Sequence, residues 1–312
     1  MTLRLQPLAR ARAASMGPDG QRWLDDLPRL VGELEQAWGL DVEGRGLPGG
    51  SASWVGRARD ADGRPRVLKI GMPGHDLDDE ARVLGLAAGR GLVGLRAHDP
   101  GRNALLLDEL GPSLEAAVLP VEEKLEHLAA ALTLVWEIPA SALTPPGPGE
   151  DKASTLTRLV LDTDTRLGHP TPPAVLDLAL EYAARRVAAH DPDRCVVVHG
   201  DPHPANALST APAPGDDGLA YRLVDPDGFL ADPAYDLGVV LREWTGRLGE
   251  RPRERLEGWC TLLADRCRLD AQVVWEWAYL ERVSTGLHVL DFGAERMGRR
   301  FLDSAATLLT GR

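Results

Sequence analysis

The segment from residue 196 to residue 225 carries polar side chains at a spacing that suits phosphoryl transfer. An apolar, β-branched run, Val196–Val198, leads to Asp201, and Asn206 follows five positions later. A second apolar run ends at Asp225. Transfer to a hydroxyl needs one carboxylate to orient that hydroxyl, and an amide oxygen and a second carboxylate to hold Mg²⁺ against the triphosphate. The spacing predicts a small-molecule kinase with Asp201 as the catalytic residue and Asn206 and Asp225 as the magnesium ligands.

Two other interpretations of these residues have to be weighed. His199 and His203 form a His-x-Asp-x-His pattern with Asp201, which could belong to a metal hydrolase. Pro202 and Pro204 flank His203, however, so the histidines cannot share one helix face as they would in a zinc helix. The segment could also be a structural turn, because short carboxylate-bearing turns commonly serve as caps and loop ends. The residues favour the kinase and leave both alternatives open.

Composition narrows the class of partner and the compartment. The chain has 312 residues and a net charge of −12, from 47 acidic and 35 basic residues. This balance disfavours nucleic acid and anionic membranes, which require a basic surface, and suits a cationic small substrate. No stretch has the apolar length of a membrane span, and residues 1–7 lack the hydrophobic region of a signal peptide. We expect a cytoplasmic, monomeric enzyme.

The first third of the chain has the features of a nucleotide site. Residues 46–59 form a Gly-rich turn that runs into an alternating strand, and Ser51 and Ser53 could donate to phosphates there. Lys69, one of only three lysines, follows in a strand pattern, where an ammonium could reach the α- and β-phosphates. Lys69 could instead be a strand-edge residue that prevents aggregation. Glu80, in the first turn of a predicted helix, is the natural partner for Lys69 or else a capping acid.

A boundary between two parts of the chain is predicted near residues 110–113. The apolar strand at 105–107 ends in Asp108 and Glu109. In a two-lobed kinase this segment would be the linker whose backbone reads the adenine edge, so we assign Glu109 to the nucleotide site. Helical patterns occupy residues 121–138 and 173–189, with a short helical stretch between Pro- and Gly-rich connections. Beyond a hairpin after Asn206, the rest of the chain is predicted to be helical.

With Lys69, Glu80, Asp201, Asn206 and Asp225 in that order, the sequence resembles the aminoglycoside phosphotransferases of the protein-kinase-like fold. Among these, the sequence looks closer to the streptomycin 6-kinase branch, the aminoglycoside/hydroxyurea resistance kinases. The resemblance implies an α+β, two-lobed fold, with a small β-rich nucleotide-binding lobe at residues 1–111 and a larger, mainly helical lobe for catalysis and acceptor binding at 112–312. It also implies a magnesium complex of ATP, or of GTP, as the phosphoryl donor.

The resemblance also implies roles for residues around the catalytic loop. Asp236 would accept backbone hydrogen bonds that brace the loop, a role compatible with helix capping, and His199 would be a structural hydrogen-bonding residue. A cationic acceptor requires carboxylates, for which Asp227 and then Glu281 are the candidates, although Glu281 could equally lie on a solvated face. Pro202 and Asp227 stand where a Leu and a Glu are expected.

The leading hypothesis is therefore inactivation of an antibiotic by phosphorylation, with streptomycin as the most favoured acceptor. Two alternatives remain. The same chemistry could act on a sugar, an amino alcohol or another metabolite, or the chain could be an inactive nucleotide-binding scaffold. The complete set of Lys, Glu, Asp, Asn and Asp residues argues against the scaffold.

Overall fold

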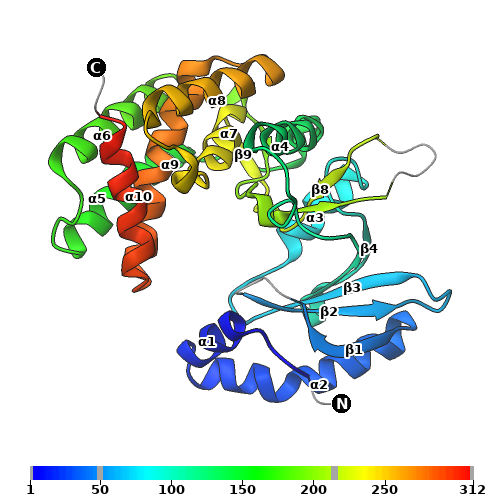
Figure 1. Ribbon diagram of the computed structural model, residues 1–312. Helices are drawn as coiled ribbons and strands as arrows, with labels where there is room; N and C mark the ends of the chain where they lie inside the picture. The colour runs from blue at the N-terminus through cyan, green and yellow to red at the C-terminus, as the bar shows by residue number, and fades with distance from the viewer. Residues whose placement is uncertain (1–2, 48–51, 212–216, 310–312) are drawn as a thin grey trace. The chain divides into compact units, whose positions relative to one another are not determined.

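The computed structural model describes residues 3–47, 52–211 and 217–309. The chain divides into two compact units, Met1–Gly111 and Pro112–Arg312. Each unit has its own arrangement of helices and strands (Figure 1). Among the described residues, no helix combines the length and the apolar character that a membrane span requires.

The first unit is built on an antiparallel five-stranded sheet with the order β1-β2-β3-β5-β4. Its strands are β1 (Asp41–Gly46), β2 (Ser53–Arg59), β3 (Pro65–Gly71), β4 (Leu95–Asp99) and β5 (Ala104–Asp108). Three helices accompany the sheet: α1 (Pro7–Ser15), α2 (Pro18–Trp38) and α3 (Asp78–Ala87).

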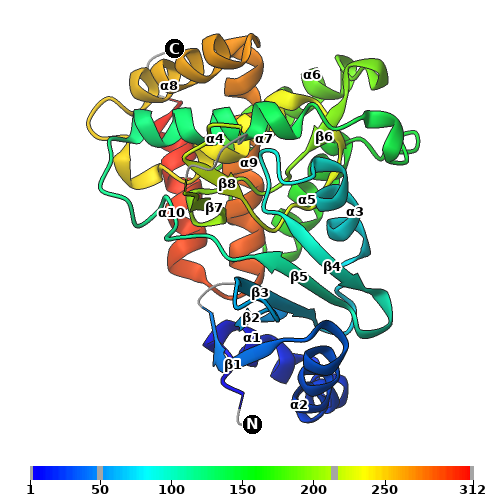
Figure 2. The ribbon, with the colours of Figure 1, turned by 90° about the vertical axis from the view of Figure 1, so that its right-hand side faces the viewer.

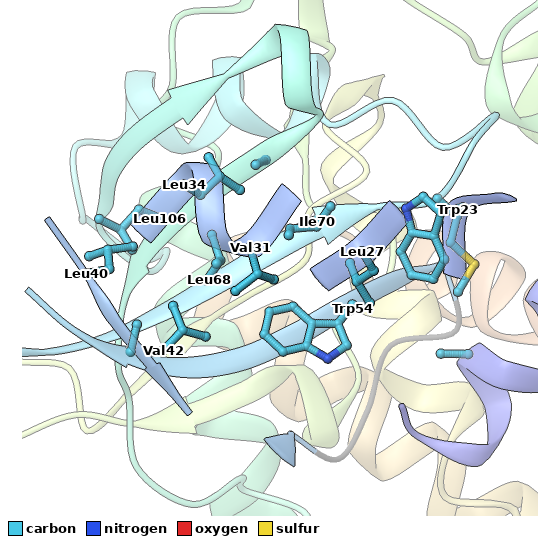
Figure 3. Close-up of a cluster of buried hydrophobic side chains, with 14 of the residues drawn as sticks. Trp23, Leu27, Val31, Leu34, Leu40, Val42, Trp54, Leu68, Ile70 and Leu106 are labelled. Carbon is cyan, nitrogen blue, oxygen red and sulfur yellow. The ribbon is translucent and has the colours of Figure 1, made fainter. Parts of the chain in front are cut away.

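Helix α2 covers one face of the sheet because its apolar residues recur every three or four positions (Figure 3). Gly39 ends this helix in the left-handed conformation, with φ = 64°. The cluster between helix and sheet is formed by Trp23, Leu27, Val31 and Leu34 of α2 with Val42, Trp54, Leu68, Ile70 and Leu106 of the strands. A single amphipathic helix thus covers one side of this cluster.

The opposite face of the sheet carries Lys69. Leu68 and Ile70 of β3 both belong to the cluster beneath α2. Side chains alternate along a strand, so Lys69 between them points to the other face. There it meets Glu80 of α3, with 2.5 Å between Nζ and Oε2.

The second unit is mainly helical, and its long helix α9 packs against five other helices, α5 to α8 and α10 (Figure 2). The helices are α4 (Val121–Val135), α5 (Lys152–Arg166), α6 (Pro173–Ala188), α7 (Pro233–Arg242), α8 (Pro252–Cys267), α9 (Ala271–Asp291) and α10 (Glu295–Thr307). Helix α5 has 15 residues, so the stretch that the sequence suggested as short is a full helix.

Four short strands in the second unit form two antiparallel pairs. They are β6 (Val196–Val198) with β9 (Phe229–Ala231), and β7 (Ala207–Ser209) with β8 (Tyr221–Leu223). The loop with Asp201 joins β6 to β7, and the loop with Asp225 joins β8 to β9. Because β6 pairs with β9 and β7 pairs with β8, the start of each loop lies beside the end of the other.

Candidate active site

Hydrogen bonds within and between the two loops hold their residues together. The Nδ2 atom of Asn206 donates to the carbonyl oxygen of Asp201 at 3.1 Å. The carbonyl oxygen of Asn206 accepts from the amide of Val224 at 2.9 Å, and the carbonyl of His199 accepts from the amide of Asp227 at 2.8 Å. The polar residues predicted at 199–227 therefore form one connected site, although they come from two loops.

His199 is a structural residue of this site. It is fully buried, and its ring bridges the loops: Nε2 lies 3.0 Å from the carbonyl oxygen of Val224, and Nδ1 accepts from the amide of Asp201 at 3.2 Å. Only the neutral tautomer with hydrogen on Nε2 fits both contacts. Burial lowers the pKa of His199 to about 4, so the ring stays neutral near pH 7.

Asp236, in the first turn of α7, holds the start of the loop that carries Asp201. Its two carboxylate oxygens accept the amide hydrogens of His199 and Gly200, each at 2.9 Å, and Trp136 Nε1 donates to it at 2.9 Å. These are the backbone bonds expected for this residue. The carboxylate is completely buried, and burial raises its pKa to about 6 despite the three donors. The helix is capped instead by Asp232.

The carboxylate of Asp201 is held at both oxygens and yet is partly open to solvent. Arg242 donates to Oδ1, and His203 Nε2 lies 3.3 Å from Oδ2. The Asp201 side chain is 37% exposed. Burial alone would raise its pKa, but the hydrogen bond from His203 and the charge of Arg242 outweigh burial and hold the pKa well below the usual range for aspartate. Asp201 is therefore ionised at neutral pH.

Glu281 occupies a different place from the one expected. Its side chain is only 3% exposed, and its Oε2 atom accepts from Nη1 of Arg242 at 2.8 Å. A carboxylate buried on a protein arginine does not face solvent, where a cationic acceptor would arrive. In this structure the carboxylate of Glu281 binds Arg242, which also donates to Asp201.

Asp227 lies at the surface of the site, beside the catalytic loop. Gly200 has φ = 93°, and a Cβ atom placed on it would come within 2.7 Å of Cβ and Oδ2 of Asp227, so only glycine fits at this position. The surrounding protein and then the negative charge of Asp201 raise the pKa of Asp227 to about 6, while Lys152 opposes this shift. The carboxylate is exposed and ionised above that pH.

Asn206 and Asp225 offer the hard oxygen ligands that Mg²⁺ prefers. Asn206 uses its Nδ2 atom on the backbone of Asp201, so its Oδ1 atom is oriented away from that bond. Asp225 adopts φ = 63°, a conformation that Asp tolerates better than most residues and that often marks functional loops. No group of three His, Cys, Asp or Glu ligands exists within the described ranges. Two protein ligands nevertheless fit an ion that keeps waters and binds phosphate oxygens.

The nucleotide-site candidates of the first unit lie on β2, on β3 and just after β5. Lys69 and Glu80 are both buried, with side chains 8% and 7% exposed. Glu109 accepts from Arg57 at 2.6 Å. Ser53 is buried, and its hydroxyl has no hydrogen-bond partner within the part of the chain that the structure describes. Ser51 lies outside the described residues.

Two residues of the site were missed in the sequence. Arg242 is one of 32 arginines, so its residue type does not distinguish it from the others. Lys152, one of three lysines, could have been noticed for its rarity. Its Nζ atom stands 4.8 Å from the ring centroids of both Phe229 and Tyr235. Lys152 also lines a cavity of about 320 Å³ together with Thr144, Pro146, Glu150, Thr155, Phe229 and Leu230.

The sequence pattern of the aminoglycoside/hydroxyurea antibiotic resistance kinase family matches residues 38–293. The chain belongs to this family. The match includes Lys69, Glu80 and the whole of the connected site at 199–242. This resistance kinase is therefore an antibiotic-inactivating phosphotransferase with a protein-kinase-like fold.

Similar proteins cover most of the kinase. It is 28% identical to a streptomycin 6-kinase of Streptomyces glaucescens, over 97% of this chain and 94% of that protein. It is 30% identical to a streptomycin 6-kinase of Streptomyces griseus, over 75% and 73% of the two chains. The structure of an aminoglycoside phosphotransferase from Streptomyces rimosus, in complex with ADP and streptomycin, superposes with a TM-score of 0.54, at 20% identity, over 83% of this chain and 98% of that one.

Proposed function

We propose that this kinase transfers the γ-phosphoryl group of ATP, bound with magnesium, to a hydroxyl of streptomycin. The similar streptomycin 6-kinases support the choice of acceptor. The observation that carries the chemistry is the connected site, in which Asp201, Asn206 and Asp225 come from two loops joined by hydrogen bonds. An in-line transfer requires such groups to be held in place before the substrate binds.

Asp201 acts on the acceptor hydroxyl. The hydroxyl oxygen forms a bond to the γ-phosphorus while the bond between that phosphorus and the β,γ-bridging oxygen breaks, and ADP leaves with the electron pair. The hydroxyl proton passes to the carboxylate of Asp201. Because Arg242 and His203 keep this carboxylate weakly basic, Asp201 mainly aims the hydroxyl and accepts its proton late, as suits a loose transition state.

Each unit contains residues whose groups suit a magnesium–ATP donor. Asn206 and Asp225 would hold magnesium, which would neutralise charge on the phosphate oxygens. Lys69, kept in place by Glu80, binds the α- and β-phosphates. Ser53 contributes its buried hydroxyl, and the backbone next to Glu109 reads the adenine edge.

Asp227 recognises the acceptor. Its carboxylate is exposed beside Asp201, so it can accept hydrogen bonds from a guanidinium group of streptomycin. We expect Asp227→Asn to raise the KM for streptomycin about 10-fold, the effect of losing one charge-assisted hydrogen bond, with a smaller change in kcat. An equal loss for an uncharged acceptor would contradict this role.

The deciding experiment measures magnesium-dependent ADP release with ATP and a panel of acceptors. The panel contains streptomycin, other aminoglycosides, hydroxyurea, simple sugars and amino alcohols, and mass spectrometry identifies the phosphorylated product. Turnover with streptomycin supports the proposal. Turnover with another compound alone overturns the acceptor and keeps the chemistry, whereas ATP binding without turnover on any acceptor overturns the function.

The catalytic assignment is tested with Asp201→Asn. We expect kcat to fall on the order of 1,000-fold, because the amide can neither orient the hydroxyl as a carboxylate does nor accept its proton. The affinity for ATP should change little. Asp177→Asn, at an exposed position of α6, is the matched control and should keep wild-type kcat. Wild-type turnover in Asp201→Asn would contradict the mechanism.

A further inference from the structure

We propose that Arg242 is a positioning residue for Asp201, fixed in turn by the buried carboxylate of Glu281. This inference rests on the proposed function, because it concerns the residue that would orient the acceptor hydroxyl. The resemblance to the family implied no role for Arg242, and Glu281 was predicted to bind the acceptor.

The guanidinium of Arg242 joins three carboxylates. Nη2 donates to Asp201 Oδ1, Nη1 to Glu281 Oε2 at 2.8 Å, and Nε to Glu243 Oε1 at 3.2 Å. The Arg242 side chain is 15% exposed. A planar guanidinium donates along fixed directions, so contacts at Nη1 and Nε determine where Nη2 points. The position of the Asp201 carboxylate is thereby tied to that of Glu281.

The exposed fraction of the side chains rises along this network from Glu281 to Asp201. Glu281 is 3% exposed, Arg242 15% and Asp201 37%. The network is thus anchored inside the unit and reaches solvent at the carboxylate that a hydroxyl must approach. Such a gradient suits a device that holds a reactive group in place while leaving one side open to substrate.

One helix holds both the backbone and the side chain of the catalytic loop. Asp236, in the first turn of α7, accepts hydrogen bonds from the amides of His199 and Gly200. Arg242, at the end of the same helix, holds the carboxylate of Asp201. Because both anchors belong to one rigid element, the loop and its reactive carboxylate keep a constant relation to each other.

The approach of α9 to α7 brings Glu281 to Arg242. A Cβ atom on Gly238 would lie 2.6 Å from Cβ of Trp277, so the two helices touch at a position where only glycine fits. Arg242 lies four residues after Gly238, and Glu281 lies four residues after Trp277. Residues four apart share a helix face, so the same contact places Glu281 opposite Arg242.

A purely structural role for Arg242 makes different predictions. If Arg242 only tied α7 to α9, its loss would lower stability, while the fraction of enzyme that remains folded would turn over normally. If Arg242 positions Asp201, its loss lowers kcat in the folded enzyme, because a displaced carboxylate misaligns the hydroxyl. The measurements must therefore be made on folded protein and must separate kcat from KM.

The experiment uses the full chain with Arg242→Met, Arg242→Lys and Glu281→Gln, assayed with ATP and the acceptor identified for the wild type. We expect Arg242→Met to lower kcat about 100-fold, the effect of a misplaced catalytic group, with little change in the KM for ATP. Arg242→Lys should recover part of the loss, because an ammonium keeps the charge but cannot copy the fork. Glu281→Gln should show a smaller loss of kcat.

Two further measurements make the assignment specific. Guanidinium at low, non-denaturing concentration should raise the kcat of Arg242→Ala and leave the wild type unchanged. Arg166→Lys, in an exposed ion pair with Asp291, is the matched control and should have wild-type kinetics. Wild-type kcat in folded Arg242→Met overturns the proposal, as does a kcat loss in Arg166→Lys equal to that in Arg242→Lys.

A double-mutant cycle, measured by unfolding, tests the contact between Arg242 and Asp201 independently of the proposed function. The single variants Asp201→Asn and Arg242→Met and the double variant are compared by urea unfolding, which needs no acceptor. Non-additive losses support the contact, and strictly additive losses overturn it. If the wild type turns over no acceptor, the proposed function fails, while the cycle still decides whether Arg242 holds Asp201.

Discussion

The two units hold their key charged groups in different ways. In the first unit, Lys69 and Glu80 form an ion pair with both side chains buried, between β3 and α3. In the second unit, Arg242 joins Asp201 to Glu281 and Glu243, and the network ends at the partly exposed carboxylate of Asp201. The first arrangement suits a cation that binds the donor and does not react. The second suits a carboxylate that must stay fixed while a hydroxyl reaches it.

The difference shows that the degree of burial of a charged group matches what that group has to do. A buried pair is costly to break, because removing one partner leaves an uncompensated charge. A network that is buried at one end and open at the other keeps its position through the buried residues and its reactivity through the exposed one. Variants that separate stability from turnover should therefore behave differently in the two units.

The largest effect is expected from Lys69→Met. Removing one member of the buried pair should lower the free energy of unfolding by about 3–5 kcal/mol. Loss of the ammonium should also raise the KM for ATP and lower kcat. Urea unfolding and steady-state kinetics measure the two effects. The double variant Lys69→Met/Glu80→Gln should recover stability without recovering activity. If it recovers both, Lys69 has only a structural role.

A smaller loss of stability is expected from Asp236→Ala, which tests how the loop with Asp201 is held in the second unit. The buried amides of His199 and Gly200 and the Nε1–H group of Trp136 would lose their acceptor. Unsatisfied buried donors should cost about 3 kcal/mol in the free energy of unfolding. Asp236→Asn, which keeps one carbonyl acceptor, should lose less. Equal stability of both variants and the wild type would show that the loop does not depend on these bonds.

The smallest effect is a pH dependence of stability that His199 adds. Burial lowers the pKa of His199 from 6.5 to about 4 in the folded protein, so its stabilisation is present above pH 6.5 and is lost as the pH falls. About 2 kcal/mol should be lost between pH 6.5 and pH 5, at 1.36 kcal/mol per pH unit. The raised pKa values of Asp227 and Asp236 act in the opposite direction. The quantity to measure is therefore the difference between wild type and His199→Gln.

In this pH experiment, His190→Gln is the matched control, because His190 is exposed. Its unfolding free energy should follow the wild-type curve from pH 7 to pH 5. A difference between wild type and His199→Gln that stays constant over this range would show that His199 is not held neutral by burial.

Much of the site could be predicted because its residues lie close together in the sequence. Asp201 and Asn206 lie in one loop, Asp225 lies in the loop after the next hairpin, and the pairing of β7 with β8 brings the two loops together. Lys69 was predictable for a related reason, since strand alternation sends it to the face opposite Leu68 and Ile70. Helix α2 and the stop at Gly39 follow from the spacing of apolar residues and from glycine.

The sequence by itself thus determined the order of the chemical groups, the elements that carry them and the class of reaction. Only the tertiary structure decided that the carboxylate of Glu281 binds Arg242 and that Arg242 in turn binds Asp201. No local pattern reveals these contacts, because they join residues about 40 positions apart through the approach of α7 to α9. That approach depends on Gly238 meeting Trp277, a match of shapes that exists only once the helices have packed.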